Sequence, residues 1–308
     1  MKIILAEPRG FCAGVNRAIE IVELALKIYG TPLYVRHEIV HNHHVVNDLK
    51  NKGVVFVETL EEVPDNSVLI FSAHGTSPKI IDTAKERGLK FVDAVCPLVT
   101  KVHLEISKAL KTNRKVIYIG HKGHQEVLGA LGYAKENEEI FLVEKVEDIE
   151  ELAKTLKDDE ISVTTQTTLS VDDTKEIMDH LAKTFSKIEF PKSDDICYAT
   201  QNRQDAVKEL VKICDHILII GSRTSSNTLR LLELAIKSGK SAELIPNPLE
   251  YRPSEDLNNK IIGISSGASA PDFLVQDLIK QLGSPPVTTL VFKEEHVEFP
   301  LPKELIKN

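Results

Sequence analysis

Three cysteines of this 308-residue chain each begin the same order of expected elements. After Cys12, Cys96 and Cys197 the hydrophobic pattern predicts a helix and then an apolar strand, and that strand ends in a polar tip. The tips lie 29, 28 and 28 residues beyond their cysteines, at His41, His124 and Ser225. This regular spacing predicts three copies of one structural unit, although few residues are identical between the copies.

The remainder of each copy follows the same order. A second helix is expected at about 43–52, 124–134 and 226–238, and the second strands are "VVFVE", "EIFLVE" and "SAELIP". The third strands run into small polar loops, in "VLIFSAHGTS", "ISVTTQTTLS" and "IIGISSGASA", and a third helix follows at about 77, 170 and 270. A fourth strand leads to the next cysteine in "LKFVDAVC" and "KIEFPKSDDIC"; "KIILAEPRGFC" at the N-terminus has the form needed to complete the third copy.

Alternating strands and helices of this length predict an α/β fold with parallel sheets and right-handed crossovers. We expect three similar small parallel-sheet units around a pseudo-threefold axis with a central cleft, because ligands bind beyond the carboxyl ends of such strands. The expected units are 13–96, 97–193 and 194–283, the third completed by the strand 1–12, and a C-terminal tail, 284–308, lies outside the repeat.

Composition limits the classes of function. The chain is 42% hydrophobic with a net charge of −8, which argues against a general nucleic-acid binder but not against a local site for an anion. No apolar run approaches the roughly 18–20 residues of a membrane span, and the N-terminus lacks a secretory core, so we expect a cytoplasmic protein without a membrane partner. Four cysteines in a chain of this length do not make a disulfide scaffold.

The three repeated cysteines are candidate metal ligands. Cys12, Cys96 and Cys197 each precede an expected helix, whose N-terminus would stabilise a thiolate, and Pro97 suits the first helical position. Cys214 instead falls on an apolar helical stripe and is expected in the core. Three thiolates without local CxxC pairs suit one [4Fe–4S] cluster with an open fourth iron; a zinc site of three cysteines and a histidine is the alternative.

Polar groups at the strand ends form a candidate site for a phosphate or diphosphate. Imidazoles, hydroxyls, amides and backbone N–H groups at helix starts are the donors that such an anion needs. No GxxxxGK[ST] or GxGxxG follows a strand, so the usual nucleotide folds are not supported. The candidate anion ligands are His41, His74, His124, Ser225, Ser226, Asn227 and Ser269.

Glu126 is the one carboxylate among these loop tips and is a candidate proton source, since burial favours the acid form of a carboxyl group. Thr167 and Thr168, in "TTQTTLS", would complete a proton or water network. We take Glu126, Thr167 and His124 as candidate catalytic residues, with Thr168 among the substrate-binding residues.

Several long motifs resemble the LytB/IspH family from residue 1 to about 283. They are "PRGFCAGVNRAI", "VRHEIVHN", "FSAHG", "DAVCPLVTKVH", "TTQTTLSVDDT", "DDICYATQNRQ", "SSN" and "GASAP". Gln125 stands where family members often carry proline, and Arg223-Thr224 precedes "SSN" where Lys-Asn is common. Neither departure replaces a matched functional residue.

The resemblance implies a two-electron reduction of 4-hydroxy-3-methylbut-2-enyl diphosphate, with loss of water, to isopentenyl and dimethylallyl diphosphates. This is the last step of the methylerythritol phosphate route to isoprenoids. It also implies that Cys12, Cys96 and Cys197 hold a [4Fe–4S] cluster and that Glu126, near Thr167, protonates the leaving hydroxyl. Ferredoxin or flavodoxin is the implied electron donor, without a bound nicotinamide or flavin.

Two other functions remain open from the residues. A zinc- or cluster-bearing sensor would have a filled fourth metal position and no use for Glu126. An aconitase-like dehydratase would use an open iron but no external electrons.

Overall fold

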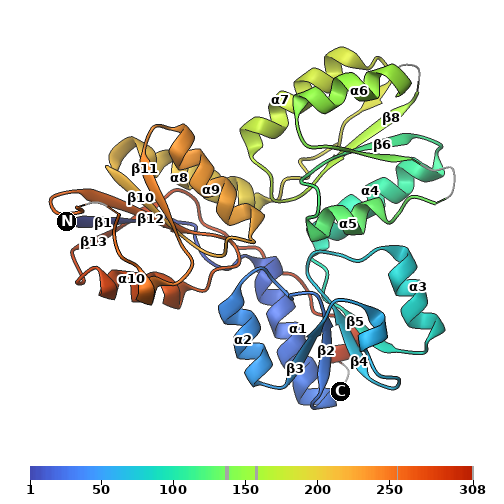
Figure 1. Cartoon of the computed structure of the whole chain (residues 1–308), viewed down its shortest axis with the longest axis horizontal. Helices are drawn as coiled ribbons and strands as arrows, with labels where there is room; N and C mark the ends of the chain where they lie inside the picture. The colour runs from blue at the N-terminus through green and yellow to red at the C-terminus, as the bar shows by residue number, and fades with distance from the viewer. Residues whose placement is uncertain (136–138, 157–158, 255, 307–308) are drawn as a thin grey trace. The chain divides into compact units, whose positions relative to one another are not determined.

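The computed structural model describes residues 1–135, 139–156, 159–254 and 256–306. It confirms an α/β fold with three parallel sheets, and Figure 1 labels most of their elements. The chain divides into two compact units. The first comprises Met1–Val15, His41–Val45 and Tyr198–Glu298, and the second comprises Asn16–Val40, Val46–Cys197 and Phe299–Asn308.

The first unit is built on a five-stranded sheet with the order β11-β10-β12-β1-β13. Its strands are β1 (Lys2–Glu7), β10 (His216–Ile220), β11 (Ser241–Ile245), β12 (Ile261–Ser266) and β13 (Val287–Val291). Its helices are α8 (Tyr198–Ile213), α9 (Ser226–Lys237), α10 (Asp272–Gln281) and the short η2 (Pro248–Glu250). Strand β1 pairs with β12 in parallel, Lys2 opposite Ile261, and therefore belongs to the sheet formed by the third copy of the repeat.

The second unit contains two four-stranded sheets. The first has the order β3-β2-β4-β5 and the second the order β7-β6-β8-β9. The first sheet comprises β2 (Leu33–Arg36), β3 (Val54–Val57), β4 (Val68–Phe71) and β5 (Lys90–Asp93). The second comprises β6 (Lys115–Ile119), β7 (Ile140–Val143), β8 (Ile161–Thr165) and β9 (Ile188–Glu189).

Helices connect the parallel strands, because a parallel pair needs a crossover connection. In the first copy they are α1 (Ala13–Tyr29), α2 (His43–Asn51), η1 (Leu60–Glu62) and α3 (Pro78–Glu86). In the second copy they are α4 (Pro97–Lys111), α5 (Gln125–Leu131), α6 (Val146–Leu156) and α7 (Val171–Thr184). The short α11 (Lys303–Ile306) follows in the tail. None of the helices in the described ranges is long and apolar enough to span a membrane.

All three sheets share one strand order. In each, the first strand of the copy lies between the second and the third, and the fourth strand lies beyond the third. The fourth strands are β5, β9 and β1, which are the strands that run into Cys96, Cys197 and Cys12. The C-terminal tail adds a fifth strand, β13, which pairs with β1 at one edge; its last two residues, 307–308, lie outside the described residues.

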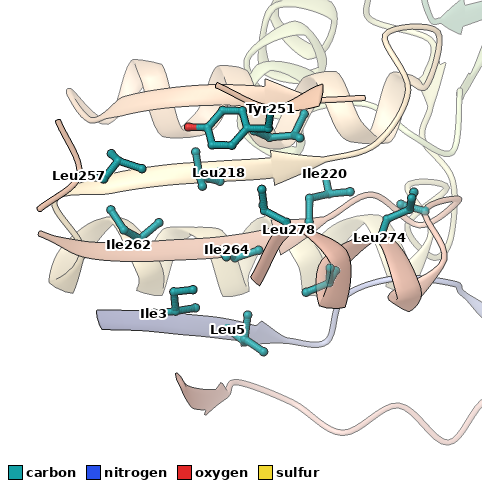
Figure 2. Packing of buried hydrophobic residues seen from close by; sticks show 13 residues of the cluster. Ile3, Leu5, Leu218, Ile220, Tyr251, Leu257, Ile262, Ile264, Leu274 and Leu278 are labelled. Carbon is teal, nitrogen blue, oxygen red and sulfur yellow. The ribbon is translucent and has the colours of Figure 1, made fainter. Parts of the chain in front are cut away.

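Apolar side chains cover both faces of the first unit's sheet, as expected for parallel strands enclosed by helices. Figure 2 shows one face, where Ile3 of β1 lies in a cluster with Ile262 of β12 and with Leu274 of α10. On the other face, Ile217 and Ile219 of β10 pack with residues of α8 and α9. Successive side chains of β1 and of β10 point to opposite faces of the sheet, so each strand contributes to both apolar layers.

Cys214 belongs to the second of these clusters and is 1% exposed, so its interpretation as a core residue is confirmed. Burial raises the pKa of its thiol to about 11. A thiol with that pKa remains protonated and unreactive at neutral pH.

Candidate functional site

The three repeated cysteines occupy equivalent places in the fold. Cys12, Cys96 and Cys197 directly precede the first residues of α1, α4 and α8, and all three are partly exposed. The cysteines form no disulfide in the part of the chain that the structure describes. Their placement puts each sulfur at a helix N-terminus, where the helix dipole favours the thiolate.

Backbone hydrogen bonds tie each cysteine to the polar loop after the third strand of its sheet. The N–H groups of Cys12, Cys96 and Cys197 donate to carbonyl oxygens over 3.2, 3.0 and 3.0 Å. The acceptors are Ala268, Ala73 and Thr167, respectively. Because Ser269 and His74 follow two of these acceptors and Thr167 is the third, each cysteine is fixed next to a predicted substrate or catalytic residue.

In the first unit, the predicted anion ligands are held at the start of α9 and in the loop after β12. The Ser225 hydroxyl caps α9 by accepting from the Thr228 N–H, and it lies 3.5 Å from the Ser269 hydroxyl. Ser269 also donates to the His41 carbonyl oxygen over 3.1 Å. Ser225, Ser226, Asn227 and Ser269 are all buried. The structure thus brings these residues together with His41.

Asn227 has both ends of its amide engaged. Its oxygen accepts from the Ala268 N–H over 2.9 Å, and its nitrogen donates to the Thr200 hydroxyl over 3.1 Å. These bonds join the start of α9 to the loop after β12 and to α8. In this structure the Asn227 side chain therefore shapes the loop that carries Ser269.

In the second unit, Glu126 and Thr167 form a buried pair. Thr167 donates to the Glu126 carboxylate from both its N–H and its hydroxyl, each over 3.0 Å. Glu126 is 3% exposed and Thr167 is 5% exposed. The Glu126 backbone N–H in turn donates to Nδ1 of His124, the residue that caps α5.

Two histidines complete the polar group of the second unit. The rings of His74 and His124 lie 6.1 Å apart at 87°, and the Ser72 hydroxyl lies 3.4 Å from Nδ1 of His74. The Thr168 hydroxyl accepts from the Gln166 side chain over 2.9 Å. Ring and hydrogen-bond contacts therefore connect His74 to His124, His124 to Glu126 and Glu126 to Thr167. Thr168 follows Thr167 in the chain.

The loop that carries His74 needs glycine. Gly75 has a φ of +89°, and a Cβ there would lie 2.5 Å from Cε1 of His103 on α4. Gly129 of α5 faces the same loop, because a Cβ at Gly129 would lie 3.4 Å from the Gly75 carbonyl. Helices α4 and α5 both pack closely against the loop at Gly75, and this packing fixes the position of His74. No side-chain pattern in the sequence indicates this close packing.

Asp195 is a buried carboxylate that the sequence analysis did not identify. It accepts from the Thr165 N–H and from the Lys101 ammonium, over 3.0 and 3.1 Å. Burial raises the pKa of Asp195 to about 7; the Glu105 carboxylate adds to this rise, and Lys101 opposes it. The signal was the acidic pair of "DDIC", directly before Cys197.

Arg203 was also missed, and its side chain is fully buried. It lies on α8 among further buried polar side chains, those of Thr200, Asn202 and Gln204. Most helices bury only an apolar stripe, so the polar run "TQNRQ" after a cysteine was the signal for a hydrogen-bonded network.

Comparison with known proteins gives consistent matches along the chain. The family model "LytB protein" matches residues 3–283. A protein of Actinobacillus pleuropneumoniae serotype 7 (strain AP76), named 4-hydroxy-3-methylbut-2-enyl diphosphate reductase, is 52% identical over 99% of this chain and 98% of its own. A protein of Haemophilus ducreyi with the same name is 53% identical over the same shares.

Two solved structures are also similar. The E-1-hydroxy-2-methyl-but-2-enyl-4-diphosphate reductase from Plasmodium falciparum matches with a TM-score of 0.92 and 36% identity, covering 99% of this chain and 96% of that one. A structure of (E)-4-hydroxy-3-methyl-but-2-enyl diphosphate reductase, described as the terminal enzyme of the non-mevalonate pathway, matches with a TM-score of 0.65 and 34% identity over 92% and 99%. With its repeated cysteine loops and a family match along nearly its whole length, this chain belongs to the LytB family.

Proposed function

We propose that this chain reduces 4-hydroxy-3-methylbut-2-enyl diphosphate, with loss of water, to isopentenyl and dimethylallyl diphosphates in the cytoplasm. The family match and the names of the relatives support this activity. The proposal is carried by one observation on this chain: a buried carboxylate, Glu126, held by two hydrogen bonds from Thr167 beside a pair of histidines.

Glu126 is proposed to protonate the substrate hydroxyl, which is a poor leaving group until it becomes water. In its acid form, Oε1 would carry the proton while Oε2 accepts from both the N–H and the hydroxyl of Thr167. These two hydrogen bonds hold the carboxyl group in one orientation. His124 holds the backbone of Glu126 at the start of α5.

The diphosphate is proposed to bind the hydroxyls of Ser225, Ser226 and Ser269 and the N-terminal end of α9. Two of these hydroxyls already lie 3.5 Å apart, and a helix N-terminus offers backbone N–H groups to an anion. His41, His74, His124, Asn227 and Thr168 are the other proposed substrate contacts.

The donor set of the three repeated cysteines fits a [4Fe–4S] cluster. Each sulfur lies at a helix N-terminus, and none is bonded to another sulfur in the described residues. We propose that Cys12, Cys96 and Cys197 hold the cluster through three of its irons. When bound, the cluster would supply electrons and a Lewis-acidic iron, with ferredoxin or flavodoxin as the external donor.

Replacement of Glu126 by glutamine tests the proton-donor role. We expect Glu126→Gln to keep the iron content of the parent and to lower turnover by about 10²–10⁴-fold, the range for loss of a general acid. Glu150→Gln, on the exposed side of α6, is the control and should leave turnover unchanged. Near-normal turnover of Glu126→Gln with a full iron content would exclude this role.

A further inference from the structure

Three cations occupy similar positions after the three cysteines. Arg17, Lys101 and Arg203 follow Cys12, Cys96 and Cys197 by five, five and six residues. They lie on α1, α4 and α8, about one and a half turns from each helix start. Each of them donates to a backbone carbonyl in the loop that precedes a different cysteine: the next one in the chain for Arg17 and Lys101, and the first one, Cys12, for Arg203.

Arg17 reaches the loop before Cys96. Its Nη1 donates to the Val95 carbonyl oxygen over 2.9 Å, and Val95 is the residue directly before Cys96. Its Nε donates to the Pro300 carbonyl oxygen in the C-terminal tail over 2.8 Å. One guanidinium therefore joins α1, the Cys96 loop and the tail.

Lys101 reaches the loop before Cys197. Its ammonium donates to the carbonyl oxygens of Ser193 and Asp194 over 3.0 and 3.1 Å. It also pairs with the Asp195 carboxylate at 3.1 Å. These three acceptors lie in residues 193–195, directly before Ile196 and Cys197. A fourth, longer ion pair joins Lys101 to Glu105 of the same helix at 3.8 Å.

Arg203 reaches the loop before Cys12, which closes the cycle in the sequence. Its Nε and Nη2 donate to the Gly10 carbonyl oxygen over 3.2 and 2.8 Å. Its Nη1 pairs with Glu295 of the C-terminal tail at 3.1 Å. Gly10 has a φ of +68°, so the carbonyl is presented by a turn that favours glycine.

Each cation also has an acidic neighbour, which limits its effect on the net charge near the cysteines. Asp195 and Glu295 form ion pairs with Lys101 and Arg203, and the negative charge of Asp93 acts on Arg17. The main effect of the three contacts is therefore on geometry and not on net charge. Each is a charge-assisted hydrogen bond that holds a loop carbonyl in one position.

We propose that Arg17, Lys101 and Arg203 are positioning residues that form a cyclic brace, in which the helix after each cysteine holds the loop before the next cysteine. The C-terminal tail completes the brace by accepting from Arg17 and Arg203. The contacts are independent of any bound group, whereas their consequence for iron rests on the proposed function. The brace predicts that removing one cation loosens the loop of the next cysteine and leaves the loop of the preceding cysteine in place.

Hydrogen exchange of the full-length, metal-free, reduced chain tests whether losing one cation loosens only the loop of the next cysteine. Lys101→Met is the first variant, since the Lys101 side chain is 30% exposed whereas that of Arg203 is fully buried. We expect exchange in residues 190–197 to accelerate by about tenfold or more, with residues 91–96 unchanged. Arg17→Met should instead accelerate exchange in residues 91–96. Lys101→Arg should restore the parent pattern, and Lys111→Met, which removes an exposed lysine from the same helix, should change neither loop.

A second measurement follows iron release from the reconstituted chain to a chelator, which we expect to accelerate by about tenfold in Lys101→Met and Arg17→Met. For Arg203, which is fully buried, the conservative Arg203→Lys variant should accelerate exchange in residues 7–12. Exchange that rises equally in both loops, or in neither, would overturn the brace. Failure of the proposed function would leave the exchange pattern intact while the parent chain itself held no iron, so the two failures are distinguishable.

Discussion

At the scale of single residues, His103 shows how burial in the core changes the pKa of a side chain. It is 6% exposed, its ring lies 4.8 Å from that of Tyr133, and burial lowers its pKa to about 4. The folded chain therefore keeps His103 neutral in a pH range where the unfolded chain protonates it near pH 6.5.

This difference predicts a loss of stability on acidification. Because the unfolded state binds the proton more tightly, His103 should lower the free energy of unfolding by about 2 kcal/mol between pH 7 and pH 5. Asp195 acts in the opposite direction, since its raised pKa makes the folded state take up a proton as the pH falls from about 7. Because the two residues have opposite effects, the contribution of His103 is measured as the difference in pH dependence between the parent and a His103 variant.

Urea unfolding of the parent and of His103→Gln at pH 7 and pH 5 measures the contribution of His103 to the pH dependence of stability. The free energy of unfolding of the parent should fall by about 2 kcal/mol more than that of the variant over this range. Equal pH dependence in the two proteins would mean that His103 titrates near its ordinary pKa in the fold.

Cys214 gives a second prediction at this scale. Cys214→Ser should leave the iron content of the reconstituted chain unchanged, because the side chain lies in the core with Val207 and Leu210. It should lower the free energy of unfolding by about 1–3 kcal/mol, since a hydroxyl would replace the thiol in an apolar cluster. Iron analysis and urea unfolding measure the two effects, and a loss of iron would show that the ligand set is wrong.

The sequence indicates which residues are candidates for the site, but it does not indicate their bonds. Spacing placed Glu126 and Thr167 at strand ends, because equivalent loops recur in every copy. Spacing does not show that Thr167 offers two donors to one carboxylate, or that Asn227 uses its whole amide within the protein. Such contacts depend on loop conformation, which has no periodic signal.

At the scale of elements, the expected helices and strands agree with the structure where the pattern is long. The helix expected at 226–238 is Ser226–Lys237, and the one expected at 43–52 is His43–Asn51. The helix expected at 124–134 ends earlier, at Leu131, where Gly132 has little helical preference. The strand before Cys197 is only Ile188–Glu189, because Pro191 follows and cannot donate to a ladder.

Strand β1 is expected to contribute strongly to stability as an interior strand of its sheet. It lies between β12 and β13, and the Ile3 side chain is fully buried. Ile3→Ala should lower the free energy of unfolding by about 2–5 kcal/mol, the usual cost of removing a large apolar side chain from a core. Lys2→Ala, at an exposed position of the same strand, is the control and should cost far less. A small effect in urea unfolding of Ile3→Ala would contradict the role of β1 as an interior strand.

At the scale of the whole molecule, the repeat accounts for the shared strand order of three sheets and for the cysteine at the start of one helix in each copy. It does not account for β13 or for the ion pair of Arg203 with Glu295, both of which involve the C-terminal tail. The tail has no counterpart in the other copies, so the spacing of the repeat carries no information on its contacts.

The central claim is that the three repeated cysteines hold a redox cluster that serves a reductase. The most direct test is to purify the chain without oxygen, count iron and sulfide, and add substrate together with reduced viologen. The account predicts about four iron per chain and viologen oxidation that depends on 4-hydroxy-3-methylbut-2-enyl diphosphate. One zinc per chain without oxidation, or consumption of the substrate without any reductant, would contradict it.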